Sequence, residues 1–330
     1  MVAALPGQRQ GTLSFPCVSK GGLSCRRHSS KAKRLLKPLR MVQRRSILEA
    51  MRTTALVFTV MALAAYGQTR IPVHAHRGAR VEMPENTIPA FERAMEVASD
   101  WIELDTAVTK DNVVVLSHDP IVNRKFCAGP EGEARIRFLT LDEVKKFDCG
   151  AKADPAFPRQ KAVPGAWMPT LDESLALLKK GESGFNIEVK SDPKKPDLYP
   201  DPASYAKLVV DAIRRHKAEK RVQVQSFDFR IVIEVKKIAP ELRLCALYGG
   251  MPKDFVEISK EAGGVPYVAP NYILVTKENV AAAHKAGLKV IPWTVNSVEA
   301  WDRLIEAGVD EIITDDPAGL IAHLKAKGRR

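Results

Sequence analysis

The sequence has no Cys-x-x-Cys pair and no cluster of cysteine with histidine, which excludes the usual zinc sites. After residue 67 it has no internal repeat and no low-complexity tract, so this part is not an array of repeats. The apolar run Ala55–Ala65 is too short for a membrane-spanning helix, which needs about 20 residues. What is present is ordinary globular composition, with 45% hydrophobic and 27% charged residues.

The sequence also has almost no net charge outside its first 67 residues. Residues 1–67 contain 12 lysines and arginines and a single acid, Glu49, so they carry +11 of the total charge of +12. The remaining residues carry only +1. A nearly neutral body offers no basic surface for DNA or RNA, so we expect no nucleic-acid partner.

The basic segment ends with the layout of a secretory signal peptide. Arg52 precedes the apolar run, and small residues stand at Ala65 and Gly67. We predict cleavage after Gly67 and export to the periplasm or out of the cell. Three alternatives stay open: an uncleaved N-terminal anchor, a different targeting signal in the first 50 residues, or translation that begins at Met41 or Met51.

Short apolar runs alternate with helix-length amphipathic segments through residues 68–330, a pattern typical of a parallel sheet. Strands are expected at 71–76, 100–105, 184–189, 221–226, 242–247, 266–270, 288–294 and 309–314. Helices are expected near 87–98, 170–180, 203–216, 228–238, 252–262, 276–286, 297–307 and 317–327. Eight such pairs in roughly 260 residues predict an α/β fold, a (β/α)8 TIM barrel that follows a basic extension and signal peptide at 1–67.

One further strand-like run, at 113–119, does not fit this alternation. Only the turn TKDN separates it from the second strand. A parallel crossover needs a dozen or more residues, so this run must fold back as a hairpin. A turn centred on Asp111 and Asn112 would place Asp105 opposite His118.

The hairpin leads into an insertion at about 120–168, which we expect to form a cap or lobe over the barrel mouth. It is rich in proline, glycine and charge and has no strong periodicity. Because export permits oxidation, we predict a disulfide between Cys127 and Cys149; the alternative is two unpaired cysteines. Cys245 lies in the apolar run LRLCALY, which favours a buried free thiol.

Polar side chains stand at the ends of several predicted strands, where a barrel places its reactive groups. Glu103, Asp105 and Glu188 would point into one mouth, because residues two apart on a strand share a face. Three carboxylates repel unless a cation holds them, and hard oxygen ligands favour Mg²⁺ or Ca²⁺. Any one of these acids alone would fit a salt bridge at the rim, but the set of three favours one divalent cation.

Two histidines stand near the same strand ends. His76 follows the first strand, and the hairpin brings His118, so they form a candidate acid–base pair. Arg77 offers a planar fork for a phosphate, and Lys190 adds a point charge. Together with a carboxylate-bound cation, these groups suggest phosphodiester cleavage. His74 also precedes the strand end, and we assign it to packing or to a supporting place behind the site residues.

The ordered set HRG, PENT, E-x-D, HD, E-x-K and W-T-V-N resembles the glycerophosphodiester phosphodiesterase family, from His74 to about Pro317. The resemblance implies a barrel enzyme that hydrolyses glycerophosphodiesters to sn-glycerol 3-phosphate and an alcohol. It implies that Glu103, Asp105 and Glu188 bind the metal. It also implies that His76 and His118 are catalytic. Residues implied to contact the phosphate or the substrate are Arg77, Lys190, Glu85, Trp293 and Asn296.

Several alternatives accompany this interpretation. Glu85 could instead be a charge at the start of a helix capped by Asn86, and Trp293 could be a core residue. The same catalytic set would serve a lysophospholipase D or a sphingomyelinase D-like enzyme. In another functional class, the protein would be an exported module that binds glycerophosphodiesters without cleaving them. The expected partner is a small molecule, with membrane-surface contact only if the substrate is a lysolipid.

Overall fold

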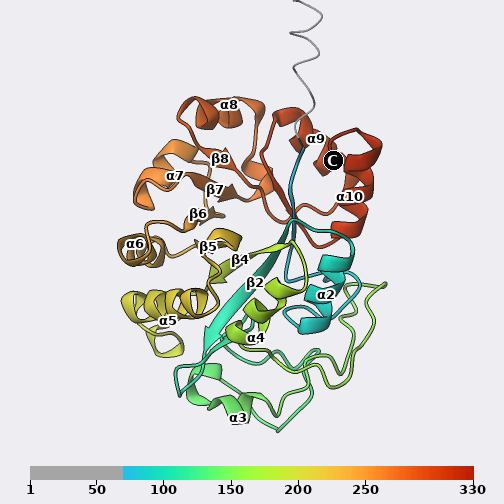
Figure 1. Ribbon diagram of the computed structural model, residues 1–330, viewed down its shortest axis with the longest axis vertical. Coiled ribbons are helices and arrows are strands. Elements are labelled where there is room, and N and C mark those ends of the chain that lie inside the picture. Colours follow the sequence, from blue (N-terminus) through green and yellow to red (C-terminus); the bar gives the residue numbers. More distant parts are fainter. Residues whose placement is uncertain (1–69) are drawn as a thin grey trace, which may run out of the picture. The chain divides into compact units, whose positions relative to one another are not determined.

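The computed structural model describes residues 70–330, so the predicted basic extension and signal peptide lie outside the described residues. Its sheet runs in the spatial order β8-β7-β6-β5-β4-β2-β1-β9, with β3 paired to β2 (Figure 1). The strands are β1 Val73–Ala75, β2 Trp101–Val108, β3 Val114–Leu116, β4 Gly184–Val189, β5 Val222–Ser226, β6 Arg243–Tyr248, β7 Tyr267–Pro270, β8 Lys289–Val290 and β9 Ile312–Thr314. All pairs along this order are parallel, and only β2–β3 is antiparallel.

Helices alternate with the strands and lie outside the sheet (Figure 1). They are α2 Ile88–Glu96, α3 Leu141–Val144, α4 Leu171–Leu175, α5 Pro202–Arg215, α6 Phe229–Ile238, α7 Phe255–Glu261, α8 Lys277–Lys285, α9 Val298–Ala307 and α10 Pro317–Ala326. Short 3₁₀ turns are η1 Ile136–Phe138, η2 Ala176–Lys179, η3 Pro196–Leu198, η4 Glu219–Arg221 and η5 Tyr272–Leu274. Among the described residues, no helix has the length and apolar character needed to cross a membrane.

Backbone hydrogen bonds join the two edge strands and close the sheet. Asp310 N donates to Val290 O at 3.0 Å, and Ile313 N donates to Pro292 O at the same distance. Val295 N donates in turn to Ile313 O at 2.9 Å. The predicted (β/α)8 barrel is therefore confirmed, with each of the eight expected strands and helices present at its expected place.

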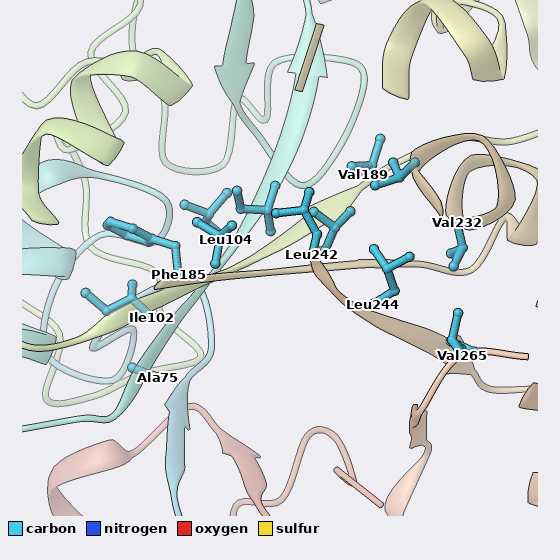
Figure 2. Packing of buried hydrophobic residues seen from close by; sticks show 14 of the residues in the cluster. Ala75, Ile102, Leu104, Phe185, Val189, Val232, Leu242, Leu244 and Val265 are labelled. Carbon is cyan, nitrogen blue, oxygen red and sulfur yellow. The ribbon is translucent and has the colours of Figure 1, made fainter. Parts of the chain in front are cut away.

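The strands bury both faces, but with different chemistry. Outward-facing residues such as Ile102, Leu104 and Phe185 pack in the main hydrophobic core (Figure 2). The alternate residues of the same strands, such as Glu103 and Asn186, lie on the opposite face, toward the barrel axis. The barrel therefore directs polar side chains of neighbouring strands toward one another.

The barrel interior contains a polar layer below the strand ends. His74 Nε2 lies 2.6 Å from a Glu311 oxygen, which also accepts a hydrogen bond from Arg243 at 2.7 Å. His74 stacks on Trp101 at a ring-centre distance of 5.7 Å. This network satisfies buried charges within the barrel, so His74 has the packing role expected for it.

The predicted hairpin forms, but its register differs by one residue from the prediction. Ala107 pairs with Val115, and Ser117 N donates to Asp105 O at 3.1 Å. Asp105 therefore lies opposite Ser117, and the prediction that it lies opposite His118 is wrong.

The cause of the shift is the size of the turn. Thr109 N donates to Val113 O at 3.0 Å, so three residues form the loop instead of two. Asn112, the last of them, has a left-handed backbone with φ of 59°. Three-residue hairpin loops place a left-handed residue at this position, and asparagine tolerates it better than most residues.

The insertion forms a lobe with a small hydrophobic core of its own. Val122, Ile136 and Phe147 pack there against Val115 of the hairpin. Gln160 Nε2 donates to Arg80 O at 2.7 Å, which ties the lobe to the loop after β1. The lobe therefore rests on the hairpin and on the β1 side of the mouth.

The lobe also contains a disulfide between Cys127 and Cys149, while Cys245 is a buried thiol. Replacing both lobe cysteines by alanine is expected to lower the free energy of unfolding by roughly 3 kcal/mol, because the bridge closes a loop of 22 residues. Denaturant unfolding of the oxidised wild type and the double variant measures this difference, and added reductant should leave the variant unchanged. Mass spectrometry that finds free thiols at both positions, or a bridge to Cys245, would contradict the pairing.

Candidate active site

A cavity of about 210 Å³ opens among the C-terminal ends of the strands. Most of the predicted site residues contribute to its wall, and Asp105 lies directly behind it with no exposed surface. The lining residues are His76, Arg77, Glu103, His118, Glu188, Lys190, Gln225, Phe227, Leu247, Trp293, Thr294 and Ile313. Of the predicted residues, Glu85 and Asn296 do not line it, and their contacts are described below.

Three carboxylates converge at this cavity, Glu103 and Glu188 on its wall and Asp105 behind it. Glu103, Asp105 and Glu188 each offer an oxygen within 4.8 Å of the others, and all three are buried. Burial, followed by the charges of Asp105 and Glu188, raises the pKa of Glu103 well above its usual value. Burial also raises the pKa of Glu188. Burial would also raise the pKa of Asp105, but the charges of Lys190 and Arg77 lower it well below its usual value, so Asp105 is the carboxylate of the three that these cations keep ionised.

The donor atoms of these three residues fit a divalent cation. Asp105 Oδ1 and Glu188 Oε1 are buried and make no well-aligned hydrogen bond. The Lys190 ammonium lies 3.1 Å from the first and 2.8 Å from the second. Two carboxylates therefore share one ammonium group, and carboxylate oxygens within 4.8 Å of one another suit Mg²⁺ or Ca²⁺.

Neighbouring side chains hold two of these carboxylates in position. Asn86 Nδ2 donates to Asp105 Oδ2 at 2.9 Å, while its carbonyl accepts from Asp105 N at 3.1 Å. Gln225 Nε2 donates to Glu103 Oε1 at 3.3 Å. The cap of helix α2 is Thr87, so the alternative in which Asn86 is the cap is wrong. The side chain of Asn86 is bonded to Asp105 instead.

A tight turn after β1 places His76 and Arg77 at the cavity. Arg77 and Gly78 both have left-handed backbones, with φ of 55° and 86°. A Cβ at Gly78 would lie 2.8 Å from the backbone carbon of Ala90, so only glycine fits there. The turn directs Arg77 N to a Glu103 oxygen at 2.9 Å, which couples the backbone to the carboxylate group.

His76 is held by an acid that the sequence interpretation missed. His76 Nδ1 lies 2.6 Å from Asp315 Oδ1, just after β9. Burial would raise the pKa of Asp315, but the hydrogen bond and charge of His76 lower it to about 2. Because an ionised carboxylate only accepts, Nδ1 must carry the proton, and Nε2 is left free to accept one. Burial, followed by the charge of Arg77, lowers the pKa of His76, which favours this neutral form.

Asn296 belongs to this arrangement rather than to the cavity wall. Its amide nitrogen donates to Asp315 Oδ2 at 2.6 Å, and its carbonyl accepts from Asp315 N at 2.9 Å. Asn296 therefore orients Asp315, which in turn orients His76. The side chain of Asn296 does not line the cavity.

Asp315→Asn is expected to lower kcat at least about tenfold, but less than loss of the histidine, with KM little changed. The amide cannot supply the negative charge that fixes the Nδ1 proton of His76. The matched control is Asp316→Asn, a neighbouring acid that caps α10 and does not contact His76. Steady-state kinetics that show equal losses for the two variants, or a change confined to KM, would contradict the positioning role.

His118 reaches the same cavity from the hairpin. It is the second residue after the last β3 position, and its side chain is about one-third exposed. Its Nδ1 lies 2.9 Å from Asp119 Oδ1, so Asp119 is placed to hold this ring as Asp315 holds the other. The two histidines thus reach one cavity from separate elements, each with a carboxylate at Nδ1.

The cationic side chains lie between the carboxylates and the cavity. Arg77 Nη1 donates to Glu85 Oε1 at 3.0 Å, and its Nε lies 3.2 Å from Asp105 Oδ2. Glu85 also lies 2.5 Å from Arg80, so this buried acid orients two arginines. Burial would lower the pKa of Arg77, but the charges of Asp105 and Glu85 raise it, and the guanidinium stays charged.

Two of the residues that the sequence interpretation missed share one signal. Asp315 and Gln225 both stand at strand ends, so the rule used for the other site residues applies to them. Their partners, however, are more than a hundred positions away in the chain. Arg80 has no such signal, because it lies inside the turn that follows β1.

The strand ends of this parallel barrel combine two acid–base histidines with two cationic side chains that match a phosphoryl group. This combination defines a hydrolase of phosphate esters. Comparison with known proteins gives the family. The Glycerophosphoryl diester phosphodiesterase family matches residues 76–319. The chain belongs to this family, which confirms both the resemblance noted from the sequence and the class of enzyme.

Individual relatives agree over nearly their whole length. A glycerophosphodiester phosphodiesterase of Caldanaerobacter subterraneus subsp. tengcongensis is 39% identical over 78% of this chain and 98% of its own. One from Bacillus subtilis is 32% identical over 75% and 84%.

Solved structures share the fold. The glycerophosphoryl diester phosphodiesterase-like protein of Silicibacter pomeroyi DSS-3 has a TM-score of 0.73 and 29% identity, over 79% of this chain and 95% of its own. A phosphodiesterase of Oleispira antarctica, solved with the product sn-glycerol-3-phosphate, has a TM-score of 0.66 at 21% identity, over 77% and 96% of the chains. At that identity the second likeness concerns the fold alone.

Proposed function

We propose that this protein hydrolyses glycerophosphodiesters to sn-glycerol 3-phosphate and an alcohol, with one divalent cation and a pair of histidines. The observation that carries the proposal is the convergence of His76, His118 and three buried carboxylates on one cavity. The name of the relative with 39% identity supports the substrate class.

Glu103, Asp105 and Glu188 would hold the cation. When bound, a divalent cation there supplies positive charge to the phosphoryl oxygens and offsets the repulsion among the carboxylates. Oxygen donors suit both Ca²⁺ and Mg²⁺, so these two ions are the candidates.

Arg77 and Lys190 contribute the remaining positive charge. Arg77 is oriented by Glu85 on one side and by Asp105 on the other, so its free edge can contact a phosphate. Lys190 lies on the cavity wall beside Glu188. Both side chains are already ordered before the substrate binds, which lowers the entropy cost of holding a charged group.

The histidines carry the protons. His76 accepts a proton at Nε2, because Asp315 fixes the other ring proton at Nδ1. His118, partly exposed, exchanges protons with a group at the outer side of the cavity. One of them deprotonates the nucleophile and the other protonates the leaving alkoxide, and the nucleophile is water or the neighbouring glycerol hydroxyl through a cyclic phosphate.

We also propose that the protein acts after export, with residues 68–330 as the catalytic domain. The disulfide in the lobe supports an oxidising compartment, because such bridges persist there and are rare in the cytosol. The signal peptide itself lies outside the described residues.

The test of this function is product formation by purified residues 68–330. With glycerophosphocholine and added Ca²⁺ or Mg²⁺, we expect sn-glycerol 3-phosphate and choline in equal amounts. Phosphorus NMR measures the first product, and proton NMR measures choline. The rival function, an exported module that binds the diester without cleaving it, predicts a binding signal and no product. Binding without turnover would therefore overturn the proposal.

A further inference from the structure

Three amide side chains are buried inside the barrel, below the cavity. Gln223 and Gln225 come from β5, and Asn186 comes from β4, the neighbouring strand. None of the three has more than 1% of its surface exposed. A buried amide is costly unless both its donor and its acceptor find partners, so the partners of these three carry information.

Hydrogen bonds join the three amides into one continuous chain, here called the amide relay. It begins where Arg243 Nε donates to Gln223 Oε1. Gln223 Nε2 donates to Asn186 Oδ1, and Asn186 Nδ2 donates to Gln225 Oε1, each at 2.9 Å. Gln225 Nε2 then donates to Glu103 Oε1 at 3.3 Å. The amide relay therefore connects the first residue of β6 with a carboxylate assigned to the cation.

The direction of the amide relay is set at its first bond. An arginine only donates hydrogen bonds, so Gln223 must turn its oxygen toward Arg243 and its nitrogen toward Asn186. Asn186 must then accept with its oxygen and donate with its nitrogen, and the same holds for Gln225. Every donor in the chain consequently points away from Arg243 and toward Glu103.

His74 requires the same orientation of Asn186. Burial lowers the pKa of His74, which favours a neutral ring with a single proton. That proton stands at Nε2, which lies 2.6 Å from the Glu311 oxygen that also accepts from Arg243. Nδ1 is therefore an acceptor, and the atom of Asn186 that lies 3.3 Å from it is the amide nitrogen.

Arg243 is itself held firmly at the N-terminal ends of the strands, opposite the cavity. Its Nη2 donates to Glu311 Oε2 at 2.7 Å. The guanidinium carbon lies 3.9 Å from the ring centre of Tyr267 and 4.7 Å from that of Trp101. Hydrogen bonds in a buried chain polarise one another, so a fixed positive charge at the start strengthens the donation that Glu103 receives at the end.

The other oxygen of Glu103 is held from the opposite side. Glu103 Oε2 accepts from Arg77 N at 2.9 Å, while Oε1 accepts from Gln225. With both oxygens held, the carboxylate keeps one orientation next to Asp105 and Glu188. Partners of this kind, which contact a metal ligand rather than the metal, orient the ligand and raise its affinity for the metal.

Resting on the proposed function, we infer that Arg243 is a positioning residue of the cation site and acts on Glu103 through the amide relay. Without Arg243, the amides of the relay lose the donor that sets their direction, and Glu103 loses a fixed partner. Cation affinity then falls. A direct effect of charge has the opposite sign, because removal of a positive charge favours a cation nearby.

Arg243→Met tests this inference, because methionine keeps an unbranched apolar stem between the two rings and removes the donors. We expect the Kd for Ca²⁺ and Mg²⁺ to rise by roughly tenfold, the lower end of the cost of losing an outer-shell partner of a metal. Calorimetric titration of the cations into chelated residues 68–330 measures it. At saturating cation, kcat for glycerophosphocholine should return close to the wild-type value, because the residue does not contact the cavity.

Gln223→Glu tests the direction of the amide relay at nearly constant side-chain size. The new carboxylate accepts from Arg243 but cannot donate to Asn186, so the amides of Asn186 and Gln225 are driven to turn over. The oxygen of Gln225 would then face Glu103. The added negative charge alone would strengthen cation binding, whereas reversal of the relay is expected to raise the Kd by roughly tenfold.

The matched control is Arg221→Met, which removes a partly buried arginine directly before β5. Arg221 donates to the carbonyl oxygens of Leu178 and Ser183 at 2.6 and 2.7 Å and has no hydrogen bond to the amide relay. Its loss removes the same charge from the same end of the barrel, and the Kd should stay as in the wild type.

The wild type offers a measurement that does not depend on the folding of a variant. Addition of Ca²⁺ or Mg²⁺ should shift the side-chain amide NMR signals of Gln225, Asn186 and Gln223, by amounts that decrease in this order. The control signal is Asn279, whose side chain donates to Leu274 O near the start of α8 and should not move. Unchanged signals for Asn186 and Gln223 would overturn the inference.

The remaining outcomes separate the inference from the function on which it rests. If the wild type binds a cation and Arg243→Met or Gln223→Glu binds it at least as tightly, the inference fails and the proposed function stands. The inference also fails if Arg221→Met weakens binding equally, or if kcat of Arg243→Met stays low at saturating cation. If the wild type binds neither Ca²⁺ nor Mg²⁺, the proposed cation site and the inference are both overturned.

Discussion

His76→Ala is expected to lower kcat by about a hundred- to ten-thousand-fold, and His118→Ala by a similar factor, which is the usual contribution of one general acid or base. Each histidine lines the cavity, and each has its Nδ1 held by a carboxylate outside the group of three, so the alanine variants remove a proton carrier and break no hydrogen bond of Glu103, Asp105 or Glu188. Steady-state kinetics on glycerophosphocholine measure the loss.

Two further measurements make this prediction specific. Cation binding and thermal unfolding should stay close to those of the wild type in both variants. His284→Ala is the matched control, because this exposed histidine also pairs with an aspartate, Asp310, but lies at the end of α8. A loss below about tenfold for His76→Ala or His118→Ala would remove that residue from the mechanism.

Glu103→Gln, Asp105→Asn and Glu188→Gln are each expected to weaken cation binding by about a hundredfold or more. Losing even an outer-shell partner of a metal costs about 10- to 100-fold, and these residues are assigned as direct ligands. Activity should fall in parallel with affinity. Calorimetric titration of Ca²⁺ and Mg²⁺ into chelated protein gives the affinity, and assays at saturating cation show how much activity returns.

The stability of these variants provides a readout that is independent of catalysis. Because burial and the charges of Asp105 and Glu188 oppose the ionised form of Glu103, its neutral replacement should not lower the unfolding temperature of the cation-free protein. The rise in unfolding temperature that added cation gives the wild type should be lost. Glu257→Gln, at an exposed site on α7, is the control and should keep that rise. A full cation-induced rise in all three variants would contradict the assignment.

The sequence allowed the barrel and most of the site to be predicted because both follow local rules. Apolar strands between amphipathic helices mark the strand ends, and the barrel then brings Glu103 of β2 and Glu188 of β4 together. The three carboxylates and both histidines could be predicted from their place at a strand or hairpin end alone.

What could not be predicted depends on backbone detail or on distant partners. The hairpin register depends on the left-handed backbone of Asn112, a conformation that asparagine permits but does not require. Asp315 acts through His76, a partner 239 positions away. The core of the lobe is built from residues such as Val122 and Phe147, whose spacing follows neither a strand nor a helix period.

We propose above that Glu103, Asp105 and Glu188 hold a cation that the phosphodiesterase reaction requires. The most direct test removes divalent cations from purified residues 68–330 with a chelator and follows sn-glycerol 3-phosphate release from glycerophosphocholine. We expect release to stop, and to return as Ca²⁺ or Mg²⁺ is added back, with a plateau near one bound cation per chain. Undiminished release of sn-glycerol 3-phosphate by the chelated protein would contradict the claim.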